Sequence, residues 1–197
     1  LREFYYSNSL LPNEGNLLFF IYTGNIGYRY PINKNEFKVI FDRNEIMEFS
    51  NESSNHFRID YYEFASFPCY QDNVVEISEI DSEELSKITR LSQKSKKQYD
   101  VNHQIFGHPA ALQGTVRFWW SLQYHGYKTE DVDNLSSEII KKIKIEEDNF
   151  ILLLQLSFGD SRIGIDYFGE SVAYFGIHKS DLKKLNFDNA ILVMQNT

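Results

Sequence analysis

Apolar and aromatic residues gather in short runs toward both ends of the chain. The runs cover residues 17–22, 37–41, 150–156, 173–177 and 190–195. Each run is rich in Phe, Tyr, Ile, Leu or Val, and Gly, Pro, Asn or Asp residues come before or after it. Short runs of this kind between turn signals are typical of buried β-strands. We therefore predict a strand at each run.

The two ends of the chain follow a common plan. In each, a glycine precedes an apolar strand, and a second apolar strand follows after an irregular stretch. This plan predicts two related β units, residues 1–64 and 149–197, that pack together around one interior. No long linker rich in Pro, Gly or Ser divides them, so we expect a single domain spanning residues 1–197.

Helical patterns occur in the middle of the chain and at one place near its end. Asp81 is the expected N-cap of a helix over 82–98, whose apolar residues recur at helical spacing. A second apolar stripe predicts a helix over 129–144, and 180–185 fits a short capped turn. Residues 57–64 partly alternate, which favours a half-exposed strand. Because regular strand and helix alternation is absent, we predict an α+β fold with mostly antiparallel strands, and helices in the middle region.

Composition indicates a folded, acidic protein. Hydrophobic residues make up 42% of the 197 residues and aromatic residues 16%, far above what disordered chains contain. There are 20 Lys and Arg residues against 28 Asp and Glu residues, which gives a net charge of −8. This balance repels phosphate backbones, so it argues against nucleic acid and favours a basic partner.

Cysteine content and apolar run lengths predict a cytoplasmic location. Cys69 is the only cysteine, so no intramolecular disulfide can form, and its aromatic neighbours indicate a small buried side chain. The longest apolar runs, 17–22 and 150–154, are much shorter than the roughly 20 residues of a membrane helix. No basic segment precedes a signal-like core. Residue 1 is Leu and not Met, which is compatible with a missing N-terminal segment.

Residues 103–113, with the sequence HQIFGHPAALQ, carry a resemblance to a known family. The order of His, Gly, Pro and Gln in this stretch is similar to that of the YwqG-like family, a bacterial group classed as a domain of unknown function. The downstream Leu-Leu-Leu-Gln and Tyr-Phe strands also resemble that family. The chain lacks the family's usual Trp-Gly-Asp loop, where it has residues 165–171, and its Gly- and Pro-rich opening. It therefore resembles a shortened or divergent member.

The two histidines of this stretch, His103 and His108, are the first candidates for a binding site. Their spacing, with no nearby Cys and no clear third ligand, does not match a zinc site, so we predict no metal and structural roles in a turn. Gly107 and Pro109 fit a tight turn. Gln113 fits a buried amide that ties this turn to a neighbouring strand.

Aromatic residues supply the remaining candidates. Trp119 and Trp120 can line a ligand groove, although core packing is their expected role, and in a strand they would point to opposite faces. We place them with His103, His108, Gln113 and Tyr174 as candidate ligand contacts. No nucleophile has an assignable base, so we predict no catalytic residue and no cofactor. The acidic runs within 76–84 and 130–148 are expected to be solvated helix faces.

Two functional hypotheses follow. The first is a non-enzymatic protein-binding module that engages a basic protein, and analogy with family members near secreted toxin systems makes it an immunity or regulatory partner. The alternative is a small-molecule-binding protein or hydrolase with a pocket between the two β halves, where His103, His108, Gln113 and Tyr174 converge.

Overall fold

The computed structural model describes residues 11–22, 32–44, 59, 61–64, 66–69, 71–72, 80–95, 103–163 and 170–196. The strands within these residues are β1 (Asn16–Ile21), β2 (Phe37–Asp42), β3 (Phe150–Ser157), β4 (Val172–His178) and β5 (Ile191–Gln195). The helices are α2 (Ser82–Ser95), α3 (Val116–Tyr124), α4 (Ser137–Glu146) and α5 (Lys179–Lys183). Short 3-10 helices are η2 (Thr129–Asn134), η3 (Glu147–Asn149), η4 (Ser161–Ile163) and η6 (Phe187–Asn189).

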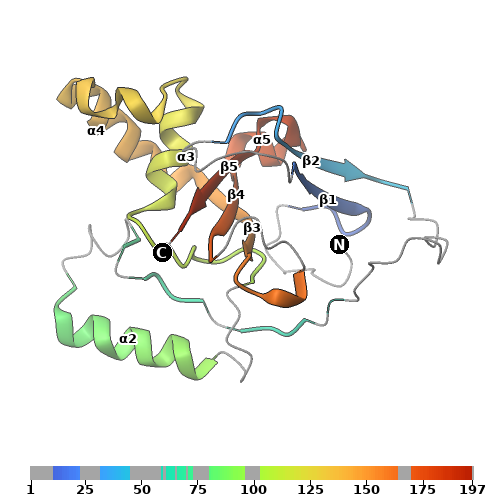
Figure 1. Cartoon of the computed structure of the whole chain (residues 1–197), viewed down its shortest axis with the longest axis horizontal. Helices are drawn as coiled ribbons and strands as arrows, with labels where there is room; N and C mark the ends of the chain where they lie inside the picture. The colour runs from blue at the N-terminus through green and yellow to red at the C-terminus, as the bar shows by residue number, and fades with distance from the viewer. Residues whose placement is uncertain are drawn as a thin grey trace.

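The strands form two antiparallel sheets, which confirms the predicted α+β class (Figure 1). Strands β1 and β2 pair with each other, and β3, β4 and β5 form a three-stranded sheet in that order. Each of the five strands predicted from the apolar runs is present, as β1 to β5. The register of β3 against β4 shifts between Leu152 and Leu154, where a bulge occurs.

One face of the three-stranded sheet packs against the β1–β2 pair. Phe175 of β4 lies at the centre of this contact, with its ring centroid 5.0 Å from that of Phe19 and 6.1 Å from that of Phe37. Both rings meet Phe175 edge to face, a favourable arrangement for aromatic pairs. The two β units therefore share one interior, as predicted. Their origin from a repeated unit stays a prediction.

Helix α3 covers the other face of the sheet. Trp120 of α3 is fully buried and donates a hydrogen bond from Nε1 to the carbonyl oxygen of Tyr174, at 3.3 Å. Its indole lies directly over Gly176 of β4, so closely that a Cβ at that position would overlap Cδ2 and Cε2 of the ring. The glycine thus makes room for the helix. Because Trp119 and Trp120 lie in a helix, the opposite-face arrangement of a strand does not apply.

The helix predicted over 82–98 is confirmed by α2 as far as Ser95, and residues 96–98 lie outside the described residues. The short turn predicted over 180–185 corresponds to α5. Asp81 caps α2, because its Oδ1 accepts hydrogen bonds from the backbone N–H groups of Glu83 and Glu84, both at 2.8 Å. The predicted helix over 129–144 is instead divided into η2 and α4. Ser136 separates them, because its hydroxyl caps α4 by accepting from the backbone N–H of Ile139, at 3.4 Å. In the part of the chain that the structure covers, no helix combines the length and apolar character of a membrane span.

The predicted strand over residues 57–64 is not formed by its described part. Residues 59 and 61–64 belong to no strand, and the rest of the range lies outside the described residues. Ile59 is 81% exposed and Tyr61 52% exposed. The alternating pattern was therefore misleading, because neither side chain packs on an interior as a half-buried strand requires.

Candidate functional site

The segment of residues 103–114 lies across the α3-covered face of the three-stranded sheet. Gln155 of β3, Tyr174 of β4 and Gln195 of β5 hold it there, and all three are buried. Gln155 pairs with Tyr174, and Tyr174 pairs with Val193, two residues before Gln195. Because side chains alternate along a strand, these three point to the same face. They form a row of polar groups across the sheet.

This row satisfies the backbone of the segment. Gln155 Oε1 accepts from the N–H of Ala110 at 2.9 Å, and the hydroxyl of Tyr174 donates to the Ala110 carbonyl at 2.8 Å. Gln195 Oε1 accepts from the N–H groups of Leu112 and Gln113, at 2.7 and 3.2 Å. Its Nε2 donates to the carbonyls of residues 113 and 114, at 3.3 and 3.0 Å. These buried side chains thus fix the segment of residues 103–114 on the sheet, and we call this segment the latch.

The start of the segment also pairs with the edge of β3. Gln104 exchanges backbone hydrogen bonds with Gln155, at 3.1 and 2.8 Å, and its Nε2 donates to the carbonyls of Phe106 and His108. Phe106 and Gly107 have φ values of 60° and 76°. A turn with positive φ is therefore present, as predicted from Gly107.

The buried-amide role predicted for Gln113 is wrong. Gln113 is exposed, and its Nε2 donates to Asn196 Oδ1 at 3.1 Å. The amides that tie the segment to strands are those of Gln155 and Gln195, and the amide of Gln104 bonds within the turn; the sequence analysis missed all three. A usable signal was present, because Gln155 and Gln195 each stand within or at the end of an apolar strand, where a polar side chain needs a buried partner.

His103 lies beside the C-terminal end of β3, and both nitrogens of its ring have hydrogen-bond partners. Its Nδ1 accepts from the N–H of Ser157 at 3.0 Å, and its Nε2 lies 3.1 Å from Asp160 Oδ2. Asp160 is buried and also accepts from the guanidinium of Arg162. These hydrogen bonds, chiefly those from Arg162 and then that from His103, hold the pKa of Asp160 well below its usual range. His103 therefore has a structural role.

Replacing Asp160 with asparagine should make the free energy of unfolding depend less on pH in the acid range. In the folded state the pKa of Asp160 is depressed, so its contribution is fully present above the unfolded value of about 3.9 and is lost as the pH falls toward the folded value. The difference in unfolding free energy between wild type and Asp160→Asn should be constant above about pH 5 and should shrink as the pH falls below about 4. Urea titrations at several pH values measure it. A difference that is constant with pH would contradict the assignment.

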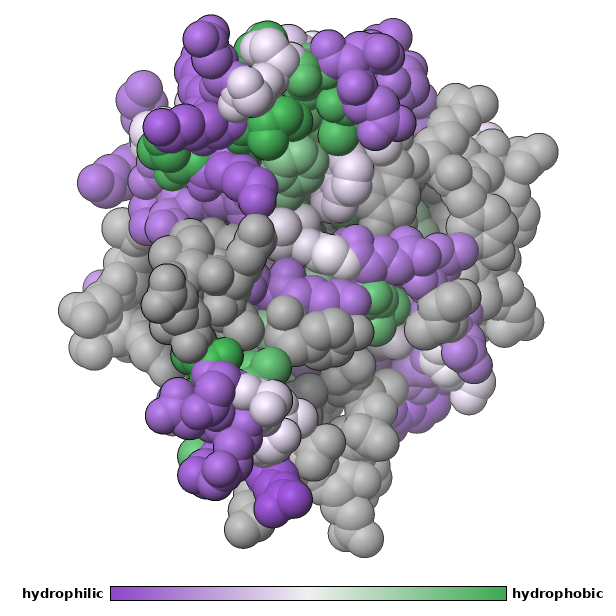
Figure 2. Space-filling view, turned by 90° about the vertical axis from the view of Figure 1, so that its left-hand side faces the viewer, coloured by the Kyte–Doolittle hydropathy of each residue, from purple (hydrophilic) through white to green (hydrophobic). Residues whose placement is uncertain are grey.

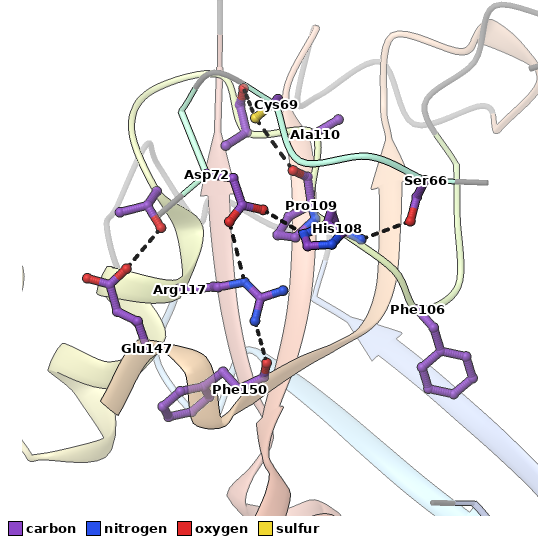
Figure 3. A network of polar contacts seen from close by, with 12 residues as sticks. Ser66, Cys69, Asp72, Phe106, His108, Pro109, Ala110, Arg117, Glu147 and Phe150 are labelled. Carbon is purple, nitrogen blue, oxygen red and sulfur yellow. Dashed lines mark hydrogen bonds and ion pairs between the residues drawn. The ribbon is translucent and has the colours of Figure 1, made fainter. Parts of the chain in front are cut away.

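His108 differs from His103 because one of its ring nitrogens has no hydrogen-bond partner among the described residues. Its Nδ1 lies 3.1 Å from Oδ2 of Asp72, whose side chain is 1% exposed. Arg117 lies on the other side of this carboxylate, with Nε 3.9 Å from Asp72 Oδ1, and donates from Nη1 to the Phe150 carbonyl at 2.8 Å (Figure 3). The ring is 30% exposed. His108 Nε2 is therefore placed to take part in a further hydrogen bond.

The segment of residues 66–69 lies beside the same turn. Ser66 Oγ accepts from the N–H of His108 at 3.1 Å, and Cys69 Sγ lies 3.7 Å from the Pro109 carbonyl (Figure 3). Burial raises the pKa of the Cys69 thiol, which keeps it protonated and weakly nucleophilic. The predicted burial of Cys69 is confirmed only in part, because the residue is half-buried, packed against the core under α3. Within the described ranges, no group of three His, Cys, Asp or Glu side chains is placed to hold a metal ion.

None of the six predicted ligand contacts lines either of the two cavities described in this section. Trp120 and Tyr174 are fully buried, and Trp119 is half-buried against the same core. A cavity of about 590 Å³ lies between the β1–β2 unit and η6. None of the six predicted residues lines it. Its walls come from other residues: Phe20, Ile21, Tyr22, Lys34, Asn35, Glu36, Phe37, Lys38, Val39, Phe187 and Asp188.

Comparison with known proteins places the chain in a family. The family described as a domain of unknown function, DUF1963, matches residues 2–195, which is nearly the whole chain. The chain belongs to the DUF1963 family. No curated protein matches it. Residues 103–114 and strands β1 to β5 of this DUF1963 protein lie within the matched range.

A second surface of the DUF1963 protein lies on helix α4. Ile143 is fully buried on the inner side of the helix, whereas Ile145 is 68% exposed on the outer side. The outer side carries a shallow groove of about 770 Å³, lined by Leu135, Ser137, Ile140, Lys141, Lys144, Ile145 and Asp148. Apart from Leu135, these residues recur every three or four positions along one helical face. We call Ser137, Ile140, Lys141, Lys144 and Ile145 the outer stripe of α4. Figure 2 shows apolar side chains on this part of the surface, within a polar surround.

Proposed function

We propose that this DUF1963 protein is a protein-binding module, and that the outer stripe of α4 contacts the partner. The observation that carries the proposal is the exposure of Ile145 in a groove that also contains Ile140 and Leu135. Single exposed apolar residues are common on protein surfaces, but apolar residues gathered in a groove with a polar rim mark interaction sites.

Helix α4 is fixed on the domain from its inner side. The inner side supplies Ile143 to the interior, and the carbonyl of Ile143 accepts a hydrogen bond from the Ser121 hydroxyl at 2.8 Å. Covering Ile145 with a partner would contribute about 1.5–3 kcal/mol from apolar burial alone. An exposed isoleucine on the solvent side of a helix therefore favours binding over a purely internal role.

Charge and family resemblance support the same class of function. The net charge of −8 argues against a nucleic acid as the partner. Within DUF1963 we propose that the chain belongs with the YwqG-like proteins, on the basis of residues 103–113. The idea of an immunity or regulatory role rests on that analogy. Net charge alone predicted a basic partner. The groove does not match that prediction, because its rim carries the positively charged Lys141 and Lys144.

Site-specific crosslinking tests the proposal. A photoreactive amino acid at position 145, expressed in the native host, should give a discrete protein adduct, whereas the same group at Lys87 of α2 should not. Lys87 is a matched control because its side chain is 65% exposed on another helix. Adduct formation should be lost when Ile140→Asp removes an apolar contact from the groove.

Two further measurements keep this test decisive. The thermal midpoint of Ile140→Asp shows whether the variant is folded. Ser137→Arg, at an exposed position of the same groove, fills the groove without removing an apolar side chain and should also abolish the adduct. Equal adducts from positions 145 and 87, or an adduct that survives both substitutions, would contradict the proposal.

A further inference from the structure

We propose that the cavity between the β1–β2 unit and η6 binds a small uncharged saccharide. The juxtaposition that carries this proposal is a pair of exposed aromatic rings, Phe20 and Tyr22, beside open polar side chains whose charges cancel. The cavity volume of about 590 Å³ lies within the range of small-ligand sites. The cavity shares no lining residue with the groove on α4, so this proposal does not depend on the proposed function.

The two rings lie on the face of the β1–β2 pair that points away from the interior. Phe20 is paired with Lys38 across the strands, and the N–H of Tyr22 continues this register by donating to the carbonyl of Glu36 at 2.7 Å. Side chains two residues apart share a face of a strand, whereas Ile21 between them packs against the apolar core. Phe20 is therefore 52% exposed and Tyr22 60% exposed.

This pair of rings favours a ligand with a flat apolar face. Among the described residues, neither Phe20 nor Tyr22 packs its ring against another aromatic ring, so both faces of the pair are open to a ligand. The two side chains leave the strand about 7 Å apart. Aromatic rings bury a large area at a contact, and the C–H groups of a sugar ring form a flat surface that can stack on them. Neighbouring units of a disaccharide can contact the two rings together.

Three polar side chains of the lining are open to the same ligand. Within the described ranges, the side chains of Asn35, Lys38 and Asp188 make no hydrogen bond and no ion pair. Two other polar residues of the lining are already engaged and are not counted. Lys34 Nζ donates to the carbonyl of Asp188 at 3.1 Å, and Glu36 Oε2 accepts from a backbone N–H at 3.2 Å.

The charges of these open groups select an uncharged ligand. Lys38 is positive and Asp188 is negative, so a ligand with a net charge of either sign is attracted by one of them and repelled by the other. A wholly apolar ligand would displace water and leave all three polar groups unpaired. A hydroxyl group both donates and accepts, so hydroxyls can pair with the ammonium, the carboxylate and the amide alike. A molecule that combines many hydroxyls with a flat face is a saccharide.

Saturation-transfer difference NMR with the full chain tests the ligand class. The probes are cellobiose and maltose as uncharged disaccharides, phenylalanine as a zwitterion with a ring, and glucose 6-phosphate as an anion. At least one disaccharide should bind with a dissociation constant of about 1 mM or lower. Its affinity should change less than about twofold between about 50 mM and about 500 mM salt, because salt screens only interactions between charges. Tighter binding of phenylalanine or glucose 6-phosphate, or no binding of either disaccharide, would overturn the proposal.

Matched variants test the location of the site. Phe20→Ala and Tyr22→Ala should each weaken disaccharide binding about fivefold or more, whereas Tyr22→Phe keeps the ring and should retain most of the affinity. Tyr61→Ala is the control, because Tyr61 is 52% exposed like Phe20 but does not line the cavity, and it should leave binding unchanged. The thermal midpoint of each variant shows whether it is folded. If neither Phe20→Ala nor Tyr22→Ala weakens binding, the disaccharide binds elsewhere and the assigned site is wrong.

Discussion

Replacing Gln195 with methionine should lower the free energy of unfolding by about 2–3 kcal/mol, because it leaves several backbone groups of the latch unpaired. The side chain accepts from the N–H groups of Leu112 and Gln113 and donates to the carbonyls of residues 113 and 114. Methionine has a similar length and shape but can make none of these bonds. Urea denaturation followed by tryptophan fluorescence measures the change.

Gln113 provides a matched control for this substitution. It is also a glutamine and lies in the same segment, but its side chain is exposed and bonds only to Asn196 in the described part of the chain. Gln113→Met should therefore change the free energy of unfolding by less than about 0.5 kcal/mol. Equal effects of the two substitutions would show that Gln195 does not hold the segment.

Replacing Gly176 with alanine should destabilise the protein by about 3 kcal/mol, at the upper end of what overpacking costs. The added Cβ would overlap the indole of Trp120 and would also lie 2.8 Å from its Cε3. Trp120 cannot move away easily, because it is fully buried and its Nε1 donates to Tyr174. Thermal and urea denaturation both report the loss.

Two companion variants make the Gly176 experiment specific. Gly159→Ala introduces the same methyl group where the closest atom would be 3.6 Å away, so it should be nearly neutral. Combining Gly176→Ala with Trp120→Leu should cost less than the sum of the single changes, because the smaller side chain removes the overlap. Full additivity would exclude a direct steric conflict between the two positions.

The strands were predictable because their signals are local. Each apolar run is short, rich in β-forming side chains and bounded by turn residues, as in Leu17–Tyr22 and Phe150–Leu156. Residues 57–64 show the limit of this reasoning. Alternation is a necessary property of a half-buried strand, but a strand also needs a neighbour to pair with, and sequence alone does not show which neighbours exist.

The candidate site was predictable only in part. The position of the turn followed from Gly107, and His108 lies in that turn, whereas His103 lies before it and contacts Ser157 and Asp160. Their partners were not predictable, because Asp72 and Asp160 lie far from them in the sequence and reach them through folding. The choice of Gln113 over Gln195 failed for a related reason. Which amide is buried depends on strand register, and the register is set by packing across the whole sheet.

The contact of His103 and Gln104 with β3 has a consequence for the behaviour of the protein at high concentration. An uncovered strand of such apolar composition is a template for pairing with another molecule, and so for aggregation. Here the backbone of Gln155 and the N–H of Ser157 are already occupied by Gln104 and His103. The segment that carries the histidines thus covers this edge of the sheet. Resistance to aggregation at this edge therefore depends on hydrogen bonds and not on packing in the apolar interior.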